Sequence, residues 1–102
     1  MAIIGGTKLN SILNGVELQI CEAALNVVKA NSDGNDQKKI DRLLKKLNAG
    51  KSFSNLEIYD LGSYILIMLR IFDDAEAMGH KVAVPKAARN HAREVAHRLQ
   101  GF

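Results

Sequence analysis

Several residue types are scarce in this sequence, and each scarcity excludes a class of protein. A single cysteine, Cys21, in 102 residues excludes a framework of intramolecular disulfides. The start of the chain, MAIIGGTKLN, lacks the basic and then apolar layout of a secretion signal, so we expect a cytoplasmic protein. The longest apolar stretch, residues 61–72, has 12 residues and contains Arg70, so it falls well short of the roughly 20 residues that span a bilayer.

Strand patterns and aromatic residues are also scarce. Only residues 81–84 alternate as a strand would, and this stretch is too short to form a sheet, so we interpret it as a connector. Aromatic residues make up 5% of the chain and do not alternate with basic ones, as surfaces that stack on single-stranded nucleic acid require. The chain has no repeat or linker, so we expect residues 1–102 to form a single helical domain.

The spacing of apolar residues predicts an all-α fold. Apolar positions recur every three to four residues between glycine- and asparagine-rich breaks, as they do on the buried face of a helix. We expect a small antiparallel bundle in which the third helix is central and a short helical turn lies near the N-terminus. The four main helices are predicted at about residues 14–30, 36–47, 55–78 and 85–100.

Start signals support these helices. Asn14 followed by Glu17, and Ser54 followed by Glu57, have the spacing of a capping box, in which each side chain bonds to the other residue's backbone N–H. Glu17 would otherwise lie within the apolar sector, and a position in the first turn places it near the positive end of the helix dipole. Asp36 is the expected N-cap of the second helix.

The third predicted helix is apolar around much of its circumference. Three short neighbours would not easily cover it, so Ile67 and Ile71, extended by Tyr64, form a candidate surface for self-association or for a partner. The alternative is that the bundle itself covers these side chains. The fourth predicted helix, by contrast, begins with Pro85 at its first position and has a narrow stripe of small apolar residues.

Charge is sorted along the chain. Residues 1–35 carry a net charge of −1, residues 36–52 of +4, residues 53–79 of −4 and residues 80–102 of +4. Two basic helices therefore flank an acidic one. Their charges are either complementary within the molecule, or are presented outward to nucleic acid, an acidic protein or anionic lipid.

These charges give the candidate binding residues. We predict a non-enzymatic protein-binding regulator, adaptor or inhibitor that docks on an acidic protein through basic helix faces. The alternative is a nucleic-acid-binding regulator that uses the C-terminal helix, where asparagine and arginine side chains are able to read base edges. The candidate residues lie on the fourth and second predicted helices: Lys86, Arg89, Asn90, Arg93, His97, Lys38, Arg42, Lys45 and Lys46.

Motifs for catalysis, cofactors and metals are incomplete. The residues 50–52, Gly-Lys-Ser, resemble the end of a phosphate-binding loop, but position 45 is a lysine where that loop requires glycine. Glu94 and His97 match half of a di-iron ligand set, and no second Glu-x-x-His exists. Cys21 falls on the apolar side of its helix, which is typical of a buried thiol rather than a nucleophile. We therefore expect no catalytic residue, no metal site and no cofactor.

Overall fold

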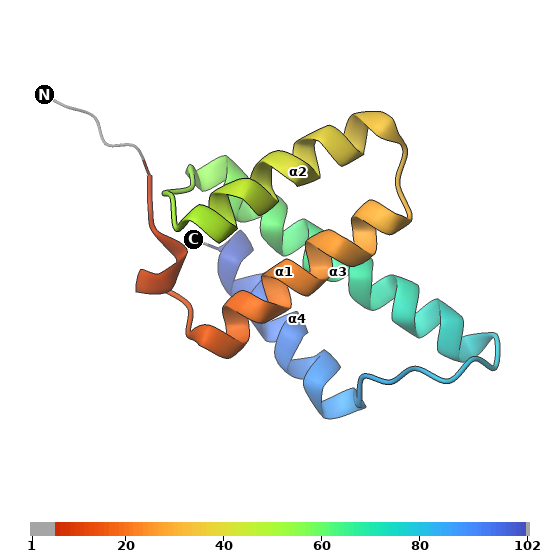
Figure 1. The fold of residues 1–102 in the computed structure, drawn as a ribbon. Helices are drawn as coiled ribbons and strands as arrows, with labels where there is room; N and C mark the ends of the chain where they lie inside the picture. Colours follow the sequence, from red (N-terminus) through yellow and green to blue (C-terminus); the bar gives the residue numbers. More distant parts are fainter. Residues whose placement is uncertain (1–5, 102) are drawn as a thin grey trace, which may run out of the picture.

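The protein is an all-α bundle of four helices. The computed structural model describes residues 6–101, in which a 3₁₀ turn, η1 (Leu9–Ser11), precedes the main helices. These are α1 (Gly15–Ala30), α2 (Gly34–Ala49), α3 (Asn55–Ala77) and α4 (Lys86–Gln100) (Figure 1). The described residues contain no strand, and residues 81–84 form the expected connector. The predicted fold class is confirmed.

Helix α3 is central, as the sequence predicts. It packs closely against both α1 and α4, and a long loop joins it to α4 (Figure 1). Helices α1 and α2 run antiparallel beside each other. Near the N-terminus, the backbone N–H groups of Thr7 and Phe53 each donate to the other residue's carbonyl at 2.8 Å, which fastens the chain start to the loop between α2 and α3.

Both predicted capping boxes are present. The backbone N–H of Glu17 donates to Asn14 Oδ1 at 2.9 Å, and the Asn14 N–H donates to Glu17 Oε1 at 3.0 Å. Ser54 and Glu57 make the same reciprocal pair at the start of α3, at 2.9 and 3.2 Å. Each pair satisfies N–H groups that have no partner within the helix, which explains why α1 and α3 begin where the sequence predicts.

Two predicted helix starts are wrong. Helix α2 begins at Gly34, because the carboxylate of Asp33 accepts the backbone N–H groups of Asn35 and Asp36 and acts as the N-cap. Asp36 is therefore inside the first turn, where its charge still suits the helix dipole. Pro85 has an extended backbone and is the N-cap of α4 rather than its first residue. Helix α2 ends at Ala49, and its C-cap Gly50 has a φ of 65°, the left-handed conformation that glycine adopts at low cost.

The core lies between the apolar faces of the four main helices, and α2 contributes the buried side chains Ile40 and Leu43 to it. The α3 side chains Ile58, Leu61, Ile65, Met68 and Leu69 are its centre. Two apolar residues near helix starts are exposed, Val16 in α1 and Ala88 in α4. None of the described helices has the length and apolarity needed to cross a membrane.

Candidate functional site

Arg89, expected on an outward basic face, is buried against the acidic end of α3. Its side chain is 6% exposed, and its guanidinium donates to Asp73 Oδ1 and Glu76 Oε2, each at 2.9 Å. The hydrogen bond to Glu76 is the main cause of the raised pKa of Arg89, and the same bond lowers the pKa of Glu76. The acidic end of α3 lies opposite this residue, so Arg89 joins α3 to α4 instead of being presented outward.

The other candidate residues of α4 do not form a continuous cationic face. Arg93 lies 3.5 Å from Asp73 through Nη2 and donates through Nη1 to Asn90 Oδ1 at 3.1 Å. Lys86, Asn90 and His97 are exposed. Lys86 therefore contributes an outward charge at one end of α4, whereas Arg93 is partly neutralised by the acidic end of α3.

Arg98, near the C-terminal end of α4, forms an ion pair with α1. Its Nη2 donates to Glu17 Oε2 at 2.5 Å, across the bundle to α1. Glu17 is buried, and the backbone N–H of Asn14, followed by Arg98, lowers its pKa. His91 Nε2 lies 3.7 Å from the same carboxylate. The buried acid predicted within the apolar sector of α1 is thus compensated by its own cap and by a cation from α4.

Helix α2 is tied to α3 by two of its lysines. Lys46 Nζ lies 2.6 Å from Glu57 Oε1, and Lys39 Nζ lies 3.0 Å from Asp60 Oδ2. Burial acts to raise the pKa of Glu57, but the bonds from Lys46 and Ser54 outweigh it and the pKa is lowered. The hydrogen bond to Asp60 raises the pKa of Lys39. Lys46, a predicted binding residue, is therefore also part of the intramolecular network.

Three predicted residues of α2 remain directed to solvent. Lys38, Arg42 and Lys45 are all exposed, and within residues 6–101 none of them makes an ion pair. Their spacing of four and three residues puts them within about 60° of one another on the helix, since successive residues turn by about 100°. We call these three residues the basic row. Of the nine predicted binding residues, these are the three that form an exposed and unpaired cationic line.

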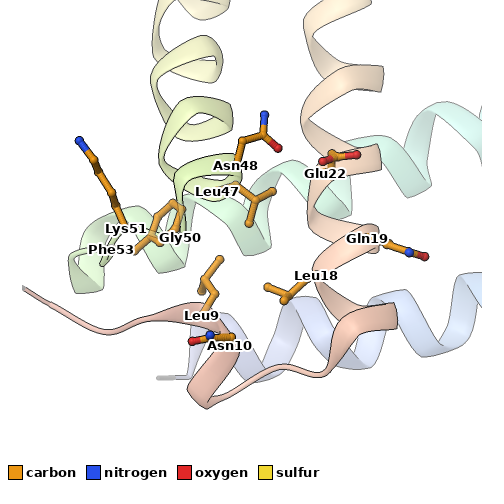
Figure 2. A pocket seen from close by; sticks show the side chains of 10 residues that line it. All are labelled: Leu9, Asn10, Leu18, Gln19, Glu22, Leu47, Asn48, Gly50, Lys51 and Phe53. Carbon is orange, nitrogen blue, oxygen red and sulfur yellow. The ribbon is translucent and has the colours of Figure 1, made fainter.

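A pocket opens beside the C-terminal end of α2. Its floor is made by Leu9 of η1, Leu18 of α1, Leu47 of α2 and Phe53, and its volume is about 250 Å³. Figure 2 shows the three leucine side chains converging from their separate elements on the same space. Leu9 and Phe53 are buried, so this floor is fixed by the core. We call this cavity the Leu–Phe pocket.

A second hollow lies on the other side of α1, between α1, α3 and α4. Its volume is about 290 Å³, and its lining is mainly apolar, with Val16 and Ile20 on α1, Met68 and Phe72 on α3 and Ala88 on α4. Arg89 also borders it, but its terminal nitrogens are bonded to carboxylates. This hollow thus lies where the first half of α1, the C-terminal half of α3 and the first half of α4 meet.

Metal-binding side chains are not brought together in the part of the chain that the structure describes. No set of three or more His, Cys, Asp or Glu side chains in residues 6–101 is arranged to hold a metal ion. Cys21 has no exposed surface, and burial raises its pKa to about 12. A thiol in this state is protonated at neutral pH and is a poor nucleophile.

No known protein family, no curated protein and no solved structure matches this chain significantly. The surface described above is therefore interpreted from its own residues.

Sequence reasoning found the basic row but not the pocket beside it. The row is visible in the sequence as basic residues at helical spacing, and the opposite charges of residues 36–52 and 53–79 indicate that some of them pair internally. Which lysine pairs with which acid depends on how α2 lies against α3. The pocket combines residues from 9 to 53, and no pattern of neighbouring residues indicates that they meet.

Proposed function

We propose that this protein is a non-enzymatic protein-binding module, a regulator, adaptor or inhibitor, that docks on an acidic partner protein through the basic row. The observation that carries the proposal is that only some of the cations of α2 form ion pairs within the molecule. Lys39 and Lys46 pair with α3, whereas Lys38, Arg42 and Lys45 stay exposed and unpaired within the described residues. After Lys39 and Lys46 have paired with carboxylates of α3, the basic row is the part of α2 that still presents positive charge to solvent.

The geometry of the row suits a helical or extended acidic segment. A rise of about 1.5 Å per residue puts Lys38 and Lys45 roughly 10 Å apart along the axis of α2. A partner helix with carboxylates spaced by four and three residues has the same repeat. Such complementary charges raise the association rate and exclude partners of like charge, although each exposed pair adds only about 0.2–1 kcal/mol.

Self-association is a further proposed use of an exposed surface. Ile67 on α3 is 44% exposed, Ile71 is partly buried, and Tyr64 is partly buried against the core. Leu56 and Tyr59 are also exposed on this side of α3, and Asp60 and Ser63 lie between them and Ile67. A second copy that covered Ile67 would remove apolar surface from water.

The second candidate function is nucleic-acid binding. The exposed basic row, together with Lys86, Asn90 and His97 of α4, is able to contact phosphates or bases. The support for α4 is weaker than for α2, because Arg89, Arg93 and Arg98 already contact carboxylates.

The test compares two charge variants of the full chain. In the first, Lys38, Arg42 and Lys45 are each replaced by glutamine. In the matched control, glutamine replaces three exposed cations that lie outside α2: Lys8, Arg70 and Lys81. Both variants lose the same net charge, so a difference between them isolates the position of the charge from its amount. Poly-L-glutamate serves as the acidic polypeptide probe, and a 20-base-pair DNA duplex serves as the nucleic-acid probe.

We expect poly-L-glutamate to bind the native chain at low salt and to bind the row variant about tenfold more weakly, as three exposed pairs imply. The control variant should bind close to the native level. Equal losses in both variants would contradict a role for the row. Duplex binding that weakens steeply with salt, with a slope reduced by as much as about three in the row variant, would favour the nucleic-acid function instead.

A further inference from the structure

We infer that the partner segment inserts one large apolar side chain into the Leu–Phe pocket while its carboxylates contact the basic row. The inference rests on the proposed function and specifies the chemistry of the partner: an acidic peptide segment with a leucine-sized anchor. It assigns the pocket to an interface and not to a small-molecule ligand.

The pocket has the properties of an anchor site. Its floor is apolar and fixed, because Leu9 and Phe53 are buried in the core and the backbone of Phe53 is bonded to Thr7. The ammonium of Lys46 lies 5.6 Å from the centre of the Phe53 ring, which further fixes that side chain. A preformed apolar floor costs little to order on binding, so it favours a side chain that fills it.

The volume also favours a side chain. Sites for drug-sized molecules usually enclose roughly 300–1,000 Å³. The Leu–Phe pocket, at about 250 Å³, is smaller and suits one bulky residue. Central apolar pockets of this kind carry much of the binding energy of protein interfaces, whereas exposed charges mainly set rate and specificity.

The rim links the pocket to the basic row. Lys51 and Asn48 line the pocket on the α2 side, and Asn48 lies one turn after Lys45. Lys51 is exposed and makes no ion pair among the described residues. In Figure 2 its side chain extends away from the floor into solvent. A segment that crosses this rim from the row therefore meets positive charge until it reaches the apolar floor.

The opposite rim has the opposite charge. Glu22 of α1 is exposed and lines the pocket across from Lys51. A carboxylate placed beside Glu22 would be repelled, so the acidic residues of the partner must lie on the α2 side of its anchor. The second hollow lacks this arrangement, because the cation that borders it, Arg89, is already bonded to Asp73 and Glu76.

The probes that test this inference are two alanine-based synthetic peptides of 16 residues. Both carry glutamates spaced by four and three residues. They differ at two positions, one helical turn before the first glutamate and one turn after the last. One peptide has leucine at both positions, and the other has alanine. Fluorescence anisotropy gives the Kd of each peptide, and amide chemical shifts of the full-length protein report where each one binds.

We expect the leucine peptide to bind the native chain about tenfold more tightly than the alanine peptide, as burial of one leucine implies. Its added chemical-shift changes should centre on Leu9, Leu18, Leu47 and Phe53. Two pocket variants should abolish the difference between the peptides and keep the weaker binding of both: Leu18→Gln, which makes the floor polar, and Asn48→Trp, which fills the mouth from an exposed position and so spares the fold. Glu22→Gln should tighten both peptides slightly.

The outcomes separate this inference from the proposed function. If both peptides bind through the basic row with equal affinity, the anchor is refuted and the acidic-partner function stands. A tenfold preference for leucine that survives in Asn48→Trp also refutes the assignment to this pocket. If neither peptide binds the native chain at low salt, the proposed function and the inference fail together, and duplex binding in the same assay would show the nucleic-acid alternative to be correct.

Discussion

Whether a charged residue of this protein is paired or exposed depends less on its type than on which side chains lie opposite it. Arg89 and Arg42 are both basic residues on amphipathic helices, yet Arg89 is buried against two carboxylates and Arg42 is exposed. The sequence predicts a basic position in each case. It does not predict the partner, because that depends on which turn of α3 faces each helix.

Glu17 gives a prediction for pH. Its pKa lies below the ordinary value of 4.5, chiefly because the Asn14 N–H and then Arg98 bond to its charged form. An acid with a lowered folded-state pKa stabilises the protein above its unfolded-state pKa, and this stabilisation is lost as the pH falls through the folded-state value. We expect the free energy of unfolding to decline below about pH 4.5. Urea denaturation at a series of pH values measures it.

The control for this prediction is Glu17→Gln, which keeps the shape of the side chain and removes its titration. We expect this variant to be less stable at neutral pH and to lose less stability on acidification. Parallel declines in the variant and the native chain would show that other carboxylates, such as Glu57 and Glu76, account for the acid sensitivity.

At the scale of helices, the sequence predicts where a helix starts better than it predicts which of its side chains are buried. The caps at Asn14 and Ser54 involve residues three positions apart, so their geometry is encoded in the sequence itself. The start of α2 has two acceptable caps in the sequence, Asp33 and Asp36, and the chain uses the earlier one. Exposure of Val16 and Ala88 was not predictable from periodicity, since it depends on where the neighbouring helices end.

The cap at Asn14 gives a second prediction. Asn14→Ala removes the acceptor for the Glu17 N–H, so we expect a loss of about 1 kcal/mol in the free energy of unfolding. Asn14→Ser retains an acceptor at the same position and should be close to the native chain. Chemical denaturation followed by far-ultraviolet circular dichroism measures both, and equal losses in the two variants would contradict a capping role.

Close packing of α3 on α4 gives a third prediction. A Cβ added at Gly62 would lie 2.7 Å from Gln100 Cγ and 2.8 Å from the backbone oxygen of Ala96. Because that oxygen cannot move unless α4 moves, we expect Gly62→Ala to destabilise the protein by about 1–2 kcal/mol, despite the better helix propensity of alanine. The control is Gly34→Ala, where a Cβ meets nothing within 4 Å. A stable Gly62→Ala variant, with an unfolding midpoint in urea at or above the native one, would contradict this packing.

In the whole molecule α3 is central and α2 lies at the edge. Helix α2 packs on α1 and buries Ile40 and Leu43 in the core, and the side chains of Lys39 and Lys46 join it to α3. Composition and periodicity were sufficient to predict the all-α class and the central position of α3. They were insufficient to predict which helix lies at the edge, because that depends on how four amphipathic faces share one core.

The fourth prediction concerns this edge position. We expect backbone amides of α2 to exchange with deuterium faster than those of α3, since a helix with fewer close neighbours opens without unfolding the rest. Mass spectrometry or NMR of the native chain in D₂O measures the two rates. A ligand on the basic row should slow exchange in α2 selectively, whereas uniform exchange across the two helices would indicate that the bundle opens only as one unit.

The complete burial of the Cys21 side chain has a practical consequence. A sulfhydryl enclosed in the middle of α1 reacts with an aromatic disulfide reagent only when that helix leaves the core, so the native chain carries a built-in colorimetric reporter of its own opening. A second cysteine placed on the surface would accept a dye while this one stays silent, which makes attachment of a single fluorophore to the folded protein straightforward.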